Sequence, residues 1–229
     1  MRIDIWSDMV CPWCWIGKHR LAAALKAHGL ADADIHWHPF LLDPEADATP
    51  VPLREAYAQK FGSAERVEQI LGQTQSTAQA EGLPMDFDQG QVRVTTLEAH
   101  RLMLLATELG VADAVGEALF RAHFAEGRNL AEREVLLAAA VAGGLDRQAA
   151  ADFLASDSGR DVLDAEMAQA QKLGIRAVPT FVFDGQLAVQ GAQTPEVFAQ
   201  VFEKLGITGA SAAEGDAAMA CGPDDGCAV

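Results

Sequence analysis

Two cysteines separated by two residues, Cys11 and Cys14, are the part of this sequence best suited to chemistry. Residues three apart on a helix lie on one face, so their sulfur atoms can meet. Such a pair can alternate between dithiol and disulfide and so carry electrons. At the junction of a strand pattern and a helix pattern, in a chain with 4 cysteines, this spacing predicts a redox site.

The surroundings of Cys11 predict which sulfur attacks. Pro12 suits the first turn of a helix, where its missing N–H is not needed. Cys11 then lies where free backbone N–H groups and the positive end of the helix dipole favour a thiolate. We expect Cys11 to be the exposed nucleophile with a lowered pKa and Cys14 to be the buried resolving thiol. Trp13 is expected to tune the reduction potential, and its ring is expected either to cover Cys14 or to contact apolar substrates.

The elements around the pair follow a strand–helix–strand order. Polar and apolar residues alternate over residues 2–6, which predicts a strand. A helix is expected from Cys14 to about His28, with Gly29 ending it. Residues 35–40 predict a second strand, and the three prolines of residues 43–52 predict a connection without an element of its own.

A long helical pattern follows, over residues 53–173, with Asp146 and Asp157 as expected helix caps. The chain then returns to strands at residues 180–183 and 187–190, joined by the Asp–Gly turn between them. A last helix begins at Pro195. The order is therefore β-α-β, a long helical block, a β-hairpin and a helix.

The net charge of the chain limits the classes of partner that it can bind. With 17 basic and 33 acidic residues, the net charge of −16 repels nucleic acid and anionic membrane surfaces. No apolar run approaches the ~20 residues of a membrane span. Asp4 and Asp8 interrupt the first apolar stretch, so we expect no signal peptide and a cytoplasmic location. In that compartment a cysteine pair is more often catalytic or metal-bound than structural.

A second motif, Val178–Pro179–Thr180, opens the later strand. Proline is ordinary as a first strand residue, but together with the cysteine pair it makes the chain resemble the thioredoxin superfamily. More narrowly, the chain is similar to DsbA-like oxidoreductases of the FrnE type. The further matching segments are residues 7–14, 16–18, 37–44, 96–102 (with Ala99–His100–Arg101) and 191–193. One departure is Thr95, where this family usually has an asparagine, and it leaves a local capping detail open.

The resemblance implies an α/β protein with a thioredoxin fold and a large α-helical insertion. The thioredoxin-like domain would comprise residues 1–52 and 174–206 with the preceding helix 157–173, and residues 53–156 would form the insertion. Residues 207–229 would be a cysteine-bearing tail. Pro179 would be cis and would face the cysteines, and Val178 and Thr180 would position a substrate backbone as an added strand.

We therefore expect a thiol-disulfide oxidoreductase that forms, reduces or isomerises disulfides in protein or small-thiol substrates. Cys11, Cys14 and Pro179 would be its catalytic residues. The sulfurs carry the electrons, so no organic cofactor is expected, and glutathione is a candidate thiol partner.

Two functions of other classes stay open. The chain also resembles, more distantly, 2-hydroxychromene-2-carboxylate isomerase and kappa-class glutathione transferases, which typically have serine at the position of Cys11. A glutathione-dependent isomerase or transferase is therefore one alternative, although a dithiol favours redox chemistry. A metal-binding thiol protein is the other alternative.

Cys221 and Cys227 form a second pair near the end of the chain, with glycines and a proline between them. Residues of these types suit a tight loop that brings the sulfurs together. The pair is then a second redox pair that exchanges with Cys11 and Cys14, part of a thiolate metal site, or incidental. We expect the redox pair and no metal.

Several other polar residues have two interpretations. Asp8 either accepts a proton during exchange or caps the turn before Cys11. His36 and His38 share a strand face as metal ligands do, but without a third ligand they are expected to lie at the surface or line the site. His100 and His123 fall in helical stretches and are expected to serve packing or capping.

Overall fold

The computed structural model describes residues 1–207 of the chain. Within that range the strands are β1 (Arg2–Ser7), β2 (Asp34–Pro39), β3 (Val51–Pro52), β4 (Val92–Arg93), β5 (Thr180–Phe183) and β6 (Leu187–Gln190). The helices are α1 (Pro12–Ala27), α2 (Leu53–Phe61), α3 (Ala64–Ala80), α4 (Leu97–Glu108), α5 (Ala112–Phe124), α6 (Arg133–Ala142), α7 (Arg147–Ala155), α8 (Arg160–Lys172) and α9 (Pro195–Lys204). The expected order of elements is confirmed.

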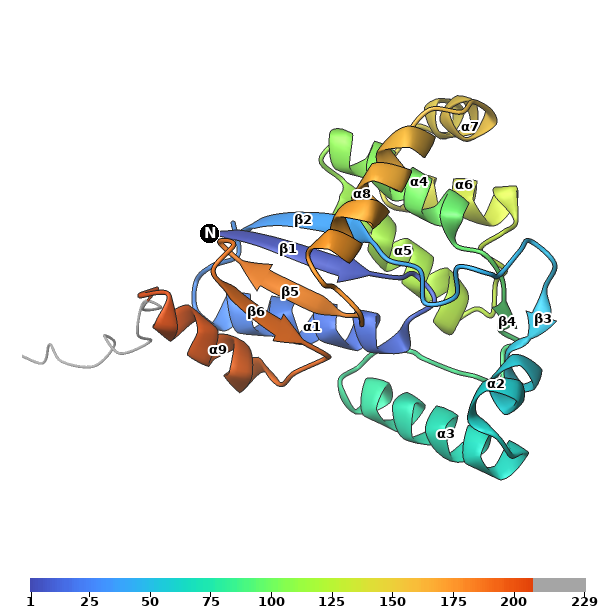
Figure 1. Cartoon of the computed structure of the whole chain (residues 1–229), viewed down its shortest axis with the longest axis horizontal. Helices are drawn as coiled ribbons and strands as arrows, with labels where there is room; N and C mark the ends of the chain where they lie inside the picture. Colours follow the sequence, from blue (N-terminus) through green and yellow to red (C-terminus); the bar gives the residue numbers. More distant parts are fainter. Residues whose placement is uncertain (208–229) are drawn as a thin grey trace, which may run out of the picture.

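A four-stranded sheet in the order β2-β1-β5-β6 forms the centre of the molecule. β1 runs parallel to β2 and antiparallel to β5, which in turn pairs antiparallel with β6. Helices α1 and α9 lie on one face of this sheet and α8 lies on the other (Figure 1). Since both faces are covered, β1 is buried at Ile3, Asp4 and Ile5 alike, and not on one face only as its alternating sequence predicted.

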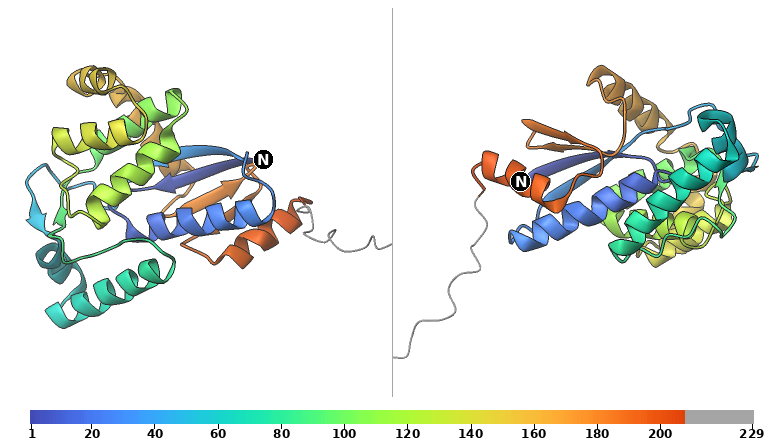
Figure 2. Two further views of the ribbon diagram at one scale, coloured as in Figure 1. Left: turned by 180° about the vertical axis from the view of Figure 1, so that it is seen from behind. Right: turned by 90° about the horizontal axis from the view of Figure 1, so that it is seen from below.

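The segment between β2 and β5 is mostly helical, as expected. Its helices gather at the end of the sheet where α1 begins (Figure 2). The indole N–H of Trp15 donates to both carboxylate oxygens of Glu117 at 3.1 Å, and the Lys18 amine lies 3.0 Å from the same carboxylate. These contacts fasten α1 to α5, so the helical segment is joined to the element that carries the cysteines.

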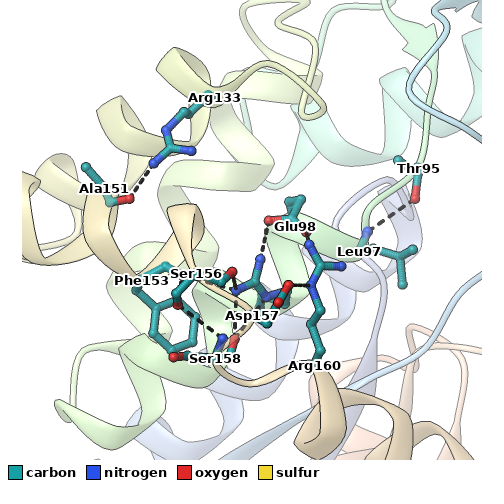
Figure 3. A network of polar contacts seen from close by, with 11 residues as sticks. Thr95, Leu97, Glu98, Arg133, Ala151, Phe153, Ser156, Asp157, Ser158 and Arg160 are labelled. Carbon is teal, nitrogen blue, oxygen red and sulfur yellow. Dashed lines mark hydrogen bonds and ion pairs between the residues drawn. The ribbon is translucent and has the colours of Figure 1, made fainter.

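Arg101 holds the far side of the helical segment together. Its side chain is fully buried, and its guanidinium donates to Glu98 and to the carbonyls of Phe153, Ser156 and Ser158 (Figure 3). A buried guanidinium needs such a set of acceptors, because its charge cannot be neutralised by losing a proton. One α4 side chain therefore fixes the turn between α7 and α8, the helix that leads to β5.

Two local expectations need correction. Residues 51–52 form a strand after all, because Val51 pairs with Arg93 in a two-stranded ladder with β4. Such a short pairing leaves no periodic signal in the sequence. Asp157 does not cap α8, which starts at Arg160 with Gly159 as its N-cap. By contrast, Asp146 caps α7 as expected, since its carboxylate accepts the Ala149 N–H at 2.8 Å.

None of the helices among residues 1–207 is long and apolar enough to cross a membrane.

Candidate active site

The cysteine pair lies at the start of α1. Cys11 is the N-cap residue, and its sulfur accepts the backbone N–H of Cys14 at 3.3 Å. The N–H of Cys11 in turn donates to the carbonyl of Asp8 at 3.0 Å. The turn before the helix is thus closed by backbone atoms, and the Cys11 sulfur occupies the N-terminal position expected of it.

Both cysteines are free thiols, and both are buried, with 3% of Cys11 and 2% of Cys14 exposed. The expectation of an exposed Cys11 is therefore wrong. Burial raises the pKa of the Cys11 thiol well above its ordinary value, and Cys14 and the charge of Asp8 act in the same direction. The N–H of Cys14 lowers this pKa but does not outweigh burial, so the expected low pKa is wrong as well. Trp13 is the exposed member of the motif, at 38%.

The Val178–Pro179 bond is cis, as expected. The Cys11 thiol donates to the Val178 carbonyl at 3.8 Å, so this loop faces the nucleophile across 167 residues of sequence. The approach depends on Gly17, where a Cβ atom would lie 3.0 Å from Cγ of Pro179 and 3.1 Å from Cζ of Phe181. Only a residue without a side chain lets the loop pack this closely on α1.

The polar groups of residues 178–180 differ in their hydrogen-bond partners. The Pro179 carbonyl already accepts the Gly191 N–H at 2.7 Å, and the Thr180 hydroxyl donates to Ala177 at 2.7 Å. Thr180 is also buried between β1 and β6. The polar groups of Pro179 and Thr180 therefore stabilise the loop, whereas the Val178 carbonyl faces the sulfur.

Asp8 and His100 form a buried polar pair beside the motif. One carboxylate oxygen of Asp8 accepts the Leu42 N–H at 2.8 Å. The other oxygen has no hydrogen bond among residues 1–207 and lies 3.4 Å from Nε2 of His100. Nε2 must carry a hydrogen, because it also lies 3.1 Å from the Phe40 carbonyl, which can only accept.

This arrangement contradicts the interpretation of the Asp8 side chain as a cap. Its backbone carbonyl, and not its side chain, caps the turn before Cys11. The carboxylate is left with a buried oxygen that can take a proton. His100 could not be predicted as its partner, because the two residues are far apart in the chain and meet only through packing.

Tyr57 lies close enough to the pair to respond to its charge, which the sequence does not indicate, whereas His123 is buried as expected of a packing residue. Burial, followed by negative charge at Cys11 and Asp8, raises the pKa of Tyr57 to about 12. Burial also lowers the pKa of His123 to about 4. Both side chains are therefore neutral at pH 7. A lone tyrosine in a helical pattern carries no sequence signal of this kind.

The two histidines of β2 do not line the redox pair. Nδ1 of His38 lies 2.6 Å from Glu166 and its Nε2 lies 2.7 Å from Asp4, while its ring stacks on Trp6. His36 lies 2.9 Å from Asp34. His38 thus joins β1, β2 and α8 through its contacts with two carboxylates.

Thr95 provides a capping hydrogen bond at the position where the family usually has an asparagine. Its hydroxyl oxygen accepts the Leu97 N–H at 3.4 Å, at the start of α4 (Figure 3).

Cys221 and Cys227 lie outside the described residues, so their pairing is not addressed by the structure. Among residues 1–207, no three or more histidine, cysteine or acidic side chains are grouped closely enough to hold a metal ion.

Known proteins share this architecture. Residues 2–210 match the family model of the DSBA-like thioredoxin domain. A probable DsbA oxidoreductase, SCO1869 from Streptomyces coelicolor, is 35% identical with a TM-score of 0.84, covering 100% of this chain and 99% of that chain. The cytosolic disulfide reductase DsbM from Pseudomonas aeruginosa, 24% identical, has a TM-score of 0.64 and covers 91% of this chain and 100% of its own; it has also been solved with GSH.

The fold also occurs in 2-hydroxychromene-2-carboxylate isomerase, at 19% identity and a TM-score of 0.68, over 90% of this chain and 96% of that one. At such identity the likeness concerns the fold alone. The family match over nearly all of the chain and the cysteine pair facing a cis-proline loop lead to one conclusion. The chain belongs to the DSBA-like thioredoxin domain family.

Proposed function

We propose that this thiol-disulfide oxidoreductase works through Cys11 as the attacking and Cys14 as the resolving thiol, and that it acts mainly as a disulfide reductase. Cys11 attacks a substrate disulfide, forms a mixed disulfide with one half and releases the other half as a thiol. Cys14 then attacks the Cys11 sulfur, which breaks the mixed disulfide and releases the second thiol. The substrate gains two electrons, and the enzyme is left with a Cys11–Cys14 disulfide.

The observation that carries the proposal is the position of the Cys11 sulfur, between the N-terminus of α1 and the Val178 carbonyl. The helix stabilises negative charge on the sulfur during attack. An extended substrate segment can pair with the backbone of Val178 in place of the Cys11 thiol, which places its own sulfur beside Cys11. We assign Pro179 and Thr180 the task of holding this loop in shape.

Burial of the pair supports the reductive direction. A strongly oxidising pair owes its potential to a stabilised thiolate in the reduced state. Here burial raises the pKa of Cys11, so its thiolate lacks that stabilisation. We expect a reduction potential nearer to the about −270 mV of thioredoxin than to the about −120 mV of DsbA.

Asp8 is the proposed proton acceptor for the resolving step. Cys14 must lose its proton before it can attack, and the free oxygen of the Asp8 carboxylate is the buried base nearest in the chain. His100 acts as a positioning residue, because its Nε2–H lies beside that oxygen.

The test is to trap the intermediate. Cys14→Ser should form a stable mixed disulfide with a substrate, because the resolving thiol is gone, whereas Cys11→Ser should form none. Mass spectrometry of the adducts and turnover of a disulfide substrate measure both. An active Cys11→Ser variant would refute the redox assignment and favour the isomerase or transferase class.

We further propose a cytoplasmic location, with a small thiol such as glutathione regenerating the dithiol. A pair that must stay reduced functions best in a reducing compartment. Cell fractionation, and the rate at which glutathione reduces the Cys11–Cys14 disulfide, test the two parts separately.

A further inference from the structure

A cavity of about 470 Å³ opens beside the segment that precedes Cys11. It lies between Val10, the β3–β4 ladder, α2 and His123 of α5. The size is that of a site for a small molecule or a large side chain. None of the steps described above uses this cavity.

The cavity is within electrostatic reach of the redox pair. Val10 is the chain neighbour of Cys11, and Tyr57 of the cavity wall responds to charge on both Cys11 and Asp8. Leu42, another wall residue, donates its backbone N–H to the Asp8 carboxylate. The cavity therefore adjoins the segment that carries Cys11.

The walls are mainly apolar, through Val10, Val51, Leu53 and Val94. Leu42 is 39% exposed, and so continues the apolar surface outside the cavity. Trp13, between the two cysteines, offers a second exposed apolar side chain. An extended peptide bound near the motif thus has two exposed apolar side chains, Leu42 and Trp13, available for contact.

The charges around the cavity cancel. Two acidic residues, Asp43 and Glu55, and two basic residues, Lys60 and Arg93, line it. Arg93 is already paired with Asp43 at 2.5 Å. The lining therefore has no surplus positive charge to recognise an anionic thiol such as glutathione.

We propose that this cavity is a subsite for a large uncharged side chain that flanks the disulfide-bonded cysteine of a substrate peptide. Apolar walls of this extent favour such a side chain over glycine by removing its surface from water, and they disfavour a carboxylate by stripping its hydration. The inference rests on the proposed function and adds to it a preference among substrate peptides.

Matched peptides test it. Each peptide has a central cysteine joined to 2-mercaptoethanol as a mixed disulfide, with tryptophan, leucine, glycine or glutamate on both sides. We expect kcat/KM for the tryptophan and leucine peptides to exceed that of the glycine peptide about tenfold. The glutamate peptide should be the slowest.

Leu53→Glu places a charge in the cavity and should abolish the preference while leaving the glycine peptide nearly unchanged. Leu173→Glu is the matched control, because Leu173 is exposed and does not line the cavity. If Leu53→Glu does not fold, Leu53→Ala should still reduce the preference at least severalfold.

The outcomes separate the subsite from the reaction. Equal kcat/KM for all four peptides, or an equal effect of Leu53→Glu on each, overturns the subsite. Selective loss of glutathione disulfide turnover in Lys60→Ala also overturns it, since the cavity would then hold an anionic tripeptide. No turnover of any peptide by the folded protein overturns the proposed function itself.

Discussion

At the scale of single residues, Asp8 links the redox pair to its surroundings. It is buried, its carbonyl holds the turn before Cys11, and its carboxylate charge opposes a thiolate there. A charge that raises the pKa of the nucleophile costs reactivity at rest. The same carboxylate is the proposed acceptor for the proton of Cys14, so its charge assists the step in which Cys14 resolves the mixed disulfide.

Asp8→Asn should therefore change two properties in opposite senses. Removing the charge lowers the pKa of Cys11 and makes the reduction potential less negative, by roughly 30 mV for each ~1.4 kcal/mol of thiolate stabilisation. Removing the base slows resolution, so the mixed disulfide accumulates. Thiol titration, redox equilibration and quenched-flow trapping measure these effects. Asp164→Asn, on the exposed face of α8, should leave all three unchanged.

At the scale of elements, the contact between α1 and the loop before β5 depends on Gly17. Alanine at this helical position gains about 1 kcal/mol of helix propensity. Its Cβ would meet Pro179 and Phe181 at 3.0 and 3.1 Å, and overpacking of this kind costs about 1–3 kcal/mol. The cost of overpacking should therefore exceed the gain in helix propensity.

Gly17→Ala is expected to lower the free energy of unfolding and to slow turnover, because it pushes Val178 away from Cys11. Gly72→Ala is the matched control, because Gly72 lies inside α3 with no atom within 4 Å of an added Cβ. In urea titrations, the free energy of unfolding of Gly72→Ala should exceed that of Gly17→Ala by roughly 1–3 kcal/mol. The reverse order would show that the loop is not packed on Gly17.

At the scale of the whole molecule, buried His123 makes stability depend on pH. Its pKa is about 4 when folded, against an ordinary value of 6.5. The unfolded chain therefore binds a proton that the folded chain excludes as the pH falls from 6.5 to 4. Stability is full above pH 6.5 and declines by up to about 3 kcal/mol across that window.

His123→Gln should remove this decline, because glutamine can still meet the Arg128 carbonyl but does not titrate. Denaturant midpoints measured between pH 7 and 4 give the comparison. His19→Gln changes an exposed histidine and should behave like the unmodified protein. A decline that survives His123→Gln would place the titrating group elsewhere.

Features that depend on neighbouring residues can be predicted from the sequence, whereas contacts between distant segments cannot. Local patterns predict the order of the main elements and the position of Cys11 at the start of α1. They do not predict that Arg101 binds the turn between α7 and α8, nor that His100 meets Asp8. Those contacts, like the burial of Cys11 and the β3–β4 ladder, join segments tens of residues apart, and a local pattern carries no record of them.

The central strand has a consequence for how the protein is made. Ile3 pairs with Phe183, so β1 leaves the ribosome about 180 residues before the strand with which it pairs. At about 5–20 residues per second this wait is roughly 10–40 s. During that time the helices of the middle segment can form, but Cys11 has no Val178 beside it. The newborn chain thus carries unshielded thiols, and its own synthesis is the stage at which they are most open to oxidation.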